Sequence, residues 1–370
     1  MLSSPQKFLL VLCCALLPAT GSAEARRSSA GQQAAHSDAS LPVFEFHSGF
    51  WINLHHFLYR QARERENPAA ATQGTNRAAH PGNPSPSAMP LFTPEEQRAW
   101  SAALDYYAAN LAERDLLVNG DMVNIKNVLA QLETCPDLAG RGSSQCASGL
   151  RPELIAVLEA AAPAYRARWW AEHDRSNRAW IVAVGPLVRQ LGGRLAEQLQ
   201  ETYHAPWPVG HLRVDVAIYG GPFGAYTSLD PVHLTISSAD PRNQGPAALE
   251  VLFHEASHAL AGAVRDAIVR ECRQRGKPIP RDLWHALLFY TTGEIVKRAL
   301  QRDPAAAGAP GSPAGAATAA ATSYTPYAYR HGLYARGWSD YQRVLERYWQ
   351  PYLEGRTDFD NAIARLVSAL

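Results

Sequence analysis

Residues 251–260 read VLFHEASHAL and combine an apolar helical pattern with three polar side chains. No proline occurs from 251 to 264, and Glu255 carries the one formal charge in that span, so we expect a buried helix. His254 and His258 stand four residues apart, which places both imidazoles on nearly the same helix face. Polar groups in a buried apolar helix are costly unless they bind something, so this triplet indicates a functional site.

The spacing His-Glu-x-x-His is the signature of zinc metalloproteases. Imidazole nitrogen is a common zinc ligand, and zinc with an open fourth position lowers the pKa of its bound water to about 7. Glu255, one step round the helix, can take the proton of that water and pass it to a leaving amine. We predict His254 and His258 as ligands of Zn2+ and Glu255 as the catalytic base.

A catalytic zinc site needs a third protein ligand. In metzincins a glycine and a histidine follow the second motif histidine by three and six residues, but this chain has Ala261 and Val264 there. We predict Glu294 instead, which lies 36 residues after His258 on a helix expected at 281–302. Its neighbours are apolar, and Gly293 would permit that helix to approach closely.

Other residues are weaker candidates for the third ligand. The acidic side chains in charged, loop-like surroundings are Asp266, Glu271 and Asp282. His285 lies nine residues before Glu294, about half a turn out of phase on a continuous helix. We interpret His285 as a supporting or surface residue rather than a ligand.

On these residues, the region from about His211 to Leu300 resembles a gluzincin-type zinc metallopeptidase domain. The likeness rests on the HEASH motif, on Glu294 downstream, and on two alternating strands expected at 211–219 and 232–236. It implies a zincin-like fold in which the edge of Val232–Ser237 pairs with an extended peptide substrate.

The resemblance also bears on the class of peptidase and on the residue that stabilises the oxyanion. Residues 224–227, GAYT, stand about where aminopeptidases of the group have Gly-Ala-Met-Glu-Asn. The glutamate that would hold a free N-terminal amine is missing, which favours an endopeptidase or another exopeptidase. Gluzincins commonly place a tyrosine or histidine downstream of the third ligand as the oxyanion donor. The candidates here are Tyr324, Tyr327, Tyr329 and His331, and we select Tyr327 because it follows Pro326 directly.

Helical periodicity dominates the rest of the chain, so the expected class is α+β, mainly helical, with a small sheet next to the HExxH helix. Thr93-Pro94-Glu95-Glu96 predicts a capped helix start. We expect a signal peptide at 1–23 and, at 24–90, an N-terminal segment with one helix and a Pro/Gly/Ser-rich linker. A helical subdomain is expected at 91–205, and a zincin-like catalytic subdomain at 206–370 with a flexible insertion at 303–322.

The first residues have the layout of an export signal. Lys7 precedes the apolar run Phe8–Leu17, and Gly21-Ser22-Ala23 offers a cleavage site. We therefore predict an exported protein, periplasmic or secreted. In that setting Cys135 and Cys146 can form a disulfide, which leaves Cys272 as a buried thiol.

Composition narrows the partners. The 35 Lys+Arg balance 34 Asp+Glu, so no positive field attracts nucleic acid, and no later stretch predicts a transmembrane segment after signal removal. We predict an exported zinc hydrolase, a peptidase whose partner is a peptide or protein substrate. Two alternatives remain, a non-catalytic zinc-stabilised envelope binding protein and a zinc amidase acting on cell-wall peptide. The oligomeric state is not readable from the sequence.

Overall fold

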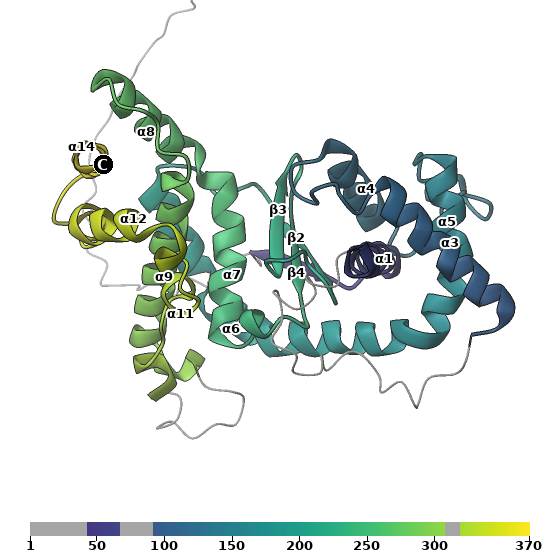
Figure 1. The fold of residues 1–370 in the computed structure, drawn as a ribbon. Coiled ribbons are helices and arrows are strands. Elements are labelled where there is room, and N and C mark those ends of the chain that lie inside the picture. The colour runs from purple at the N-terminus through teal and green to yellow at the C-terminus, as the bar shows by residue number, and fades with distance from the viewer. Residues whose placement is uncertain (1–42, 67–91, 308–318) are drawn as a thin grey trace, which may run out of the picture. The chain divides into compact units, whose positions relative to one another are not determined.

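The computed structural model describes residues 43–66, 92–307 and 319–370 (Figure 1). The predicted export signal, most of the linker before residue 90 and the centre of the 303–322 tract lie outside these residues. Within the described ranges, no helix is both long enough and apolar enough to cross a lipid bilayer.

Four strands form one mixed sheet in the order β1-β2-β4-β3. Their bounds are β1 (Phe44–His47), β2 (Leu212–Ala217), β3 (Ala225–Leu229) and β4 (Val232–Ser237). β1, β2 and β4 run parallel, and β3 pairs antiparallel with β4. β2 and β4 confirm the two expected strands, whereas β1 and β3 were not predicted. Because β1 precedes the linker, the N-terminal segment contributes a strand to this sheet.

The position of β4 corrects one expectation. β4 lies inside the sheet with β2 on one side and β3 on the other, so its backbone groups are used by its neighbours. Val232–Ser237 therefore offers no free edge to a substrate. The edge strand on the side of the HExxH helix is β3, and an edge strand presents unpaired N–H and C=O groups.

Helices make up most of the described structure, which confirms the mainly helical α+β class. The N-terminal helices are α1 (Phe50–Glu66), α3 (Pro94–Asn110), α4 (Gly120–Gln131), α5 (Pro152–Tyr165) and α6 (Ala171–Tyr203). The C-terminal helices are α7 (Pro246–Ser257), α8 (Gly262–Gln274), α9 (Leu283–Arg302), α11 (Tyr327–Arg330), α12 (Ser339–Val344), α13 (Gln350–Leu353) and α14 (Phe359–Ala369). The helix expected at 246–270 is interrupted by a 3-10 turn, His258–Leu260.

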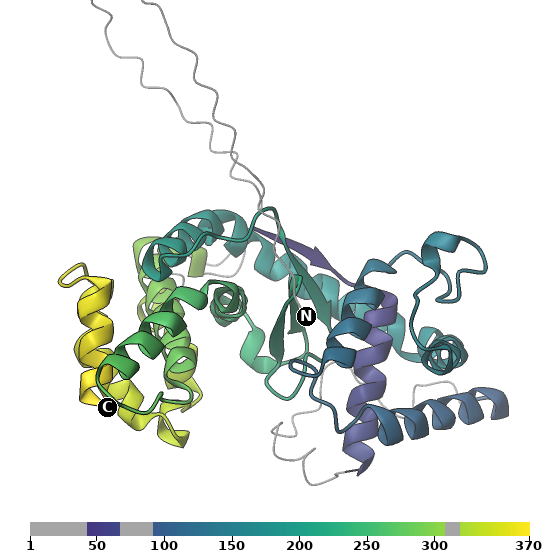
Figure 2. The same cartoon turned by 90° about the horizontal axis from the view of Figure 1, so that it is seen from above.

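The two faces of the sheet pack against different helices (Figures 1 and 2). Val214 and Leu234 belong to the apolar core that includes α6, α7 and α9. Because side chains alternate along a strand, Asp215 and His233 point to the opposite face, where α1 and α4 lie. There Lys126 of α4 donates a hydrogen bond to the carbonyl of His233 at 3.1 Å. The sheet thus separates an apolar core under the HExxH helix from a buried polar layer.

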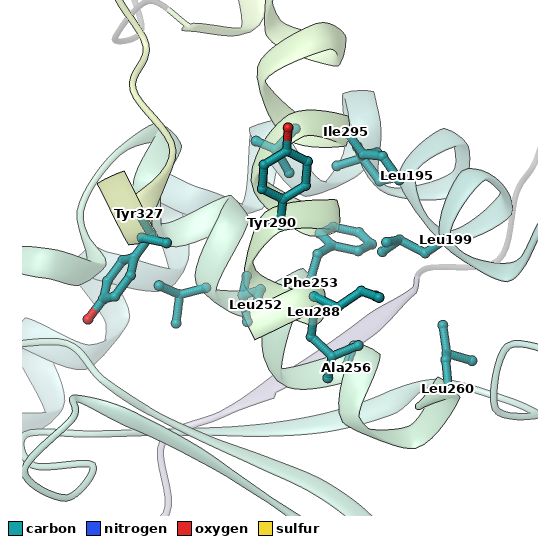
Figure 3. Packing of buried hydrophobic residues seen from close by; sticks show 14 of the residues in the cluster. Leu195, Leu199, Leu252, Phe253, Ala256, Leu260, Leu288, Tyr290, Ile295 and Tyr327 are labelled. Carbon is teal, nitrogen blue, oxygen red and sulfur yellow. The ribbon is translucent and has the colours of Figure 1, made fainter. Parts of the chain in front are cut away.

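Apolar packing on both flanks fixes the position of α7. Figure 3 shows the side chains from α7, α6 and α9 that meet in this core, which include Leu252, Phe253, Ala256, Leu195, Leu199 and Leu288. Burying a leucine or phenylalanine side chain contributes about 1.5–3 kcal/mol. The helix that carries the candidate site is therefore firmly held in the core.

Several local predictions are confirmed. Thr93 Oγ1 accepts a hydrogen bond from Glu96 N, and Glu96 Oε2 accepts one from Thr93 N, which completes the capping box of α3. Cys135 and Cys146 form a disulfide, and Cys272 is a buried free thiol.

Candidate metal centre

Three histidines from two helices converge beside the sheet. One nitrogen from each of His254, His258 and His285 lies within 4.8 Å of the other two. Their ring centroids are 5.1 Å (His254–His258), 5.3 Å (His254–His285) and 5.1 Å (His258–His285) apart. The three rings therefore form a compact triangle that could hold a metal ion, and it is the one such group in the described part of the chain.

One of the nitrogen–nitrogen distances matches the value expected for zinc. Tetrahedral zinc with Zn–N bonds of 2.0–2.1 Å separates its ligand atoms by about 3.3 Å. The Nε2 atoms of His254 and His285 lie 3.3 Å apart. His254 Nδ1 is buried and has no hydrogen-bond partner among the described residues, so its Nε2 is the atom directed at the cluster.

Burial keeps the three rings uncharged near neutral pH. Desolvation, followed by the neighbouring histidines, lowers the pKa of His254 well below its usual value. The same causes lower the pKa of His258 to about 3, and desolvation lowers that of His285 to about 4. Metal ions bind the neutral imidazole, so these lone pairs are available at pH 7.

The third ring is His285, and the structure does not bring Glu294 to the motif histidines. Glu294 follows His285 by nine residues on α9, about 13.5 Å along the axis and on the opposite side of the helix. Its Oε1 lies 3.7 Å from Lys297 Nζ. Of the two side chains, it is His285 that faces the motif histidines. His285 therefore replaces Glu294 as the candidate third ligand.

A signal for His285 was present in the sequence. His285 and Phe289 are four residues apart and share one face of α9. In the structure Phe289 stacks on His254, with ring centroids 3.6 Å apart and planes at 19°. Phe289 lies one turn after His285, and Trp284 directly precedes His285. These aromatic neighbours indicate the face of α9 that meets the HExxH helix.

Glu255 lies beside the histidines and is itself buried, with 7% of its surface exposed. Its Oε2 is 4.0 Å from His258 Nε2 and 2.7 Å from the hydroxyl of Thr227, which donates to it. Burial raises the pKa of Glu255 to about 7, against the opposing effects of the Thr227 hydrogen bond and the Lys126 charge. A carboxyl group with this pKa can both accept and release a proton near neutral pH.

The edge strand β3 places Thr227 against Glu255. Thr227 also contacts the main-chain carbonyl of Glu255 at 3.0 Å, so the hydroxyl bridges the strand and α7. Side chains alternate along β3, which turns Ser228 to the opposite face, where its hydroxyl accepts a hydrogen bond from Lys126 at 2.6 Å. The acid of the motif is thereby oriented by the strand at the sheet edge.

Aromatic rings surround the three histidines. His258 lies 5.7 Å from Trp284, and His285 lies 5.6 Å from Trp338, measured between ring centroids. Phe289, already stacked on His254, stacks in turn on Tyr327 at 5.7 Å. This layer limits the access of water to the cluster while His258 and His285 stay partly exposed.

Among the tyrosine candidates, the Tyr327 hydroxyl lies beside Arg242 and within reach of the charge of Glu255. The Tyr324 hydroxyl donates to Glu250, and the Tyr329 hydroxyl donates to Glu346 at 2.9 Å, so both are engaged elsewhere. Burial raises the pKa of Tyr327, while the charge of Arg242 lowers it and that of Glu255 raises it. Figure 3 shows its ring directed away from the apolar core, with the hydroxyl at the far end.

Comparison of the chain with protein-family models, with curated proteins and with solved structures gave no match.

Proposed function

We propose that this protein is a zinc-dependent hydrolase that cleaves peptide bonds. The observation that carries the proposal is the pairing of a three-histidine cluster with a buried acid at its edge. His254, His258 and His285 would hold the ion, and Glu255 would act as the general base. The disulfide between Cys135 and Cys146 supports action in an exported, oxidising setting, because such bonds are rare in the cytosol.

A zinc ion held by these three histidines would supply a Lewis acid and would lower the pKa of water at the site to about 7. Glu255 receives the proton of the attacking water on Oε2, where the Thr227 hydroxyl orients the carboxylate. It then delivers that proton to the nitrogen of the leaving amine as the C–N bond breaks. The Tyr327 hydroxyl donates a hydrogen bond to the carbonyl oxygen as negative charge develops on it.

The position of β3 at the edge of the sheet suggests how an extended substrate would be held. A peptide that added to β3 would form main-chain hydrogen bonds to that strand and pass beside Thr227 and Glu255. This places the substrate one strand further out than the sequence suggested, on β3 rather than β4.

The proposed centre departs from the gluzincin pattern in its third ligand. Gluzincins use a downstream glutamate, whereas the third group here is the imidazole of His285. We therefore propose zinc as the metal and hydrolysis as the reaction, and we assign the chain to no known family.

The non-catalytic alternative is less well supported. A zinc-stabilised binding protein would need the three histidines but not a carboxylate beside them. Burying Glu255 without a compensating role costs free energy, so its position favours a hydrolase.

The test combines metal analysis with cleavage of a mixed peptide library that includes cell-wall peptides. We expect the wild-type protein to contain zinc, and Glu255→Gln to keep the zinc while losing about 10²–10⁴-fold in cleavage rate. Glu294→Gln is the matched control, since it makes the same change on a carboxylate outside the cluster, and it should cleave normally. Zinc retention with no cleavage by the wild-type protein would support the binding protein. Absence of zinc from the wild-type protein would contradict both functions.

A further inference from the structure

A second buried acid, Glu250, lies on α7 one helical turn before His254. It is 1% exposed, and its carboxylate is held by hydrogen bonds from the chain that returns after α9. Both of its oxygens lie 2.9 Å from the backbone N of Tyr327, whose N–H donates to them. The Tyr324 hydroxyl donates to Oε2. Glu250 thus ties the 324–327 segment to the helix that carries His254 and His258.

A carboxylate is an expensive group to bury, so its partners decide whether the arrangement is stable. Desolvation raises the pKa of Glu250 to about 7, and the hydrogen bonds from Tyr324 and Tyr327 oppose that shift. An apolar side chain could fill the same space at lower cost but could not capture the N–H of Tyr327. Glu250 therefore holds the 324–327 segment in place and is not needed to pack α7.

Gly293 on α9 makes room for the contact. A Cβ atom at Gly293 would lie 2.6 Å from Cβ of Pro326 and 3.0 Å from Oε1 of Glu250. Real Cβ atoms do not approach other atoms as closely as 2.6 Å, so any side chain here would displace Pro326. The absence of a side chain lets α7, α9 and the 324–327 segment meet at one point.

The contact fixes Tyr327 relative to the metal centre. Its N–H is held by Glu250, and its ring stacks on Phe289, which stacks on His254. We propose that Glu250 is a positioning residue that sets the orientation of Tyr327, and with it the direction of its hydroxyl, through the backbone of Tyr327. The inference rests on the proposed function only for the role of that hydroxyl, because the hydrogen-bonded contact exists whatever the chemistry is.

The first test measures the contact without any assay of activity. In the zinc-loaded protein, Glu250→Gln, Tyr324→Phe and Gly293→Ala should each speed amide hydrogen exchange across 324–331 by about tenfold or more, as expected for loss of a hydrogen bond to a charged group. Zinc content should not change. Gly120→Ala is the matched glycine control, since a Cβ there meets nothing within 4 Å, and its exchange should equal that of the wild type. Unchanged exchange in Glu250→Gln and Gly293→Ala would overturn the proposal.

The second test asks whether Glu250 acts through Tyr327. Glu250→Gln should lower kcat with little effect on KM, and it should have no further effect in a Tyr327→Phe background. Independent, multiplicative losses in the double variant would overturn the positioning role. If the wild-type protein cleaves no peptide, the proposed function fails, and the exchange measurement still decides on the contact. Should Glu250→Gln fail to fold, Tyr324→Phe supplies the same comparison, because it removes one hydroxyl only.

Discussion

Nε2 of His285 lies 3.3 Å from Nε2 of His254, although the two residues are 31 positions apart and on different helices. The contact brings α9 against α7 at the HExxH motif and completes a triangle with His258. Without a metal ion, one of these imidazoles can donate a hydrogen bond to the other, whereas a shared cation would bind the lone pairs of both nitrogens. This contact is the geometric basis for assigning the third ligand to His285.

Removal of the Tyr327 hydroxyl should slow cleavage while leaving metal binding intact. Loss of one oxyanion-hole donor typically costs about 10²–10³-fold in kcat. We expect Tyr327→Phe to lose activity within this range, measured on a peptide that the wild-type protein cleaves, with unchanged zinc content.

Tyr329→Phe is the matched control for that variant. The Tyr329 hydroxyl is bonded to Glu346, away from the cluster, so its removal should leave kcat unchanged. Equal losses in the two variants would argue against a donor role for Tyr327.

Lys126 should make stability depend on pH. Desolvation lowers its pKa from 10.5 to about 7, although the charges of Asp215 and Glu255 oppose this. Between pH 7 and about 10.5 the unfolded chain binds the proton that the folded chain has lost, so the Lys126 contribution to stability rises with pH across that window. Below pH 7 the full cost of its buried charge is present.

The check is urea unfolding of the wild-type protein and of Lys126→Met at pH 7, 8.5 and 10. The free energy of unfolding of the wild type should rise relative to that of Lys126→Met as the pH rises, because the variant has no titrating group at position 126. A difference that stays constant over this range would show that Lys126 keeps an ordinary pKa.

The disulfide should stabilise the protein by restricting the unfolded chain. Cys135 and Cys146 are 11 residues apart, and closing a loop of about this length contributes about 3 kcal/mol. We expect Cys135→Ser to lose this amount in urea unfolding. Cys135→Ser with Cys146→Ser should lose no more than the single variant. A reducing agent should lower the stability of the wild type but not of the double variant, and equal sensitivity of both would contradict the assignment.

Much of the fold could be predicted because short stretches of sequence determine many of its helices and strands. The capping box at Thr93, the strands β2 and β4, and the helical periods around His254 and Glu294 each need only a few neighbouring residues to be recognised. β1 escaped because its four residues run directly into an aromatic-rich helix, and β3 escaped because Ala-Tyr-Thr-Ser-Leu does not alternate between apolar and polar residues.

The candidate third ligand could not be predicted from local sequence patterns. His285 and Glu294 occupy opposite faces of α9, and helical periodicity alone does not say which face meets α7; the aromatic neighbours of His285 are the local hint. The rotation of one helix against another depends on packing across the whole core, through residues such as Leu288 and Phe253. The motif residues could therefore be predicted from the sequence, and their partner from the next helix could not.

The most direct test of the central claim is the zinc dissociation constant of His285→Ala compared with that of Glu294→Ala, by competition with a chelator. Loss of a hydrogen bond that supports a metal ligand weakens metal binding by roughly 10–100-fold. We predict that His285→Ala weakens zinc binding by more than this and that Glu294→Ala binds zinc as the wild type does. Weakened binding in Glu294→Ala together with wild-type affinity in His285→Ala would contradict the account.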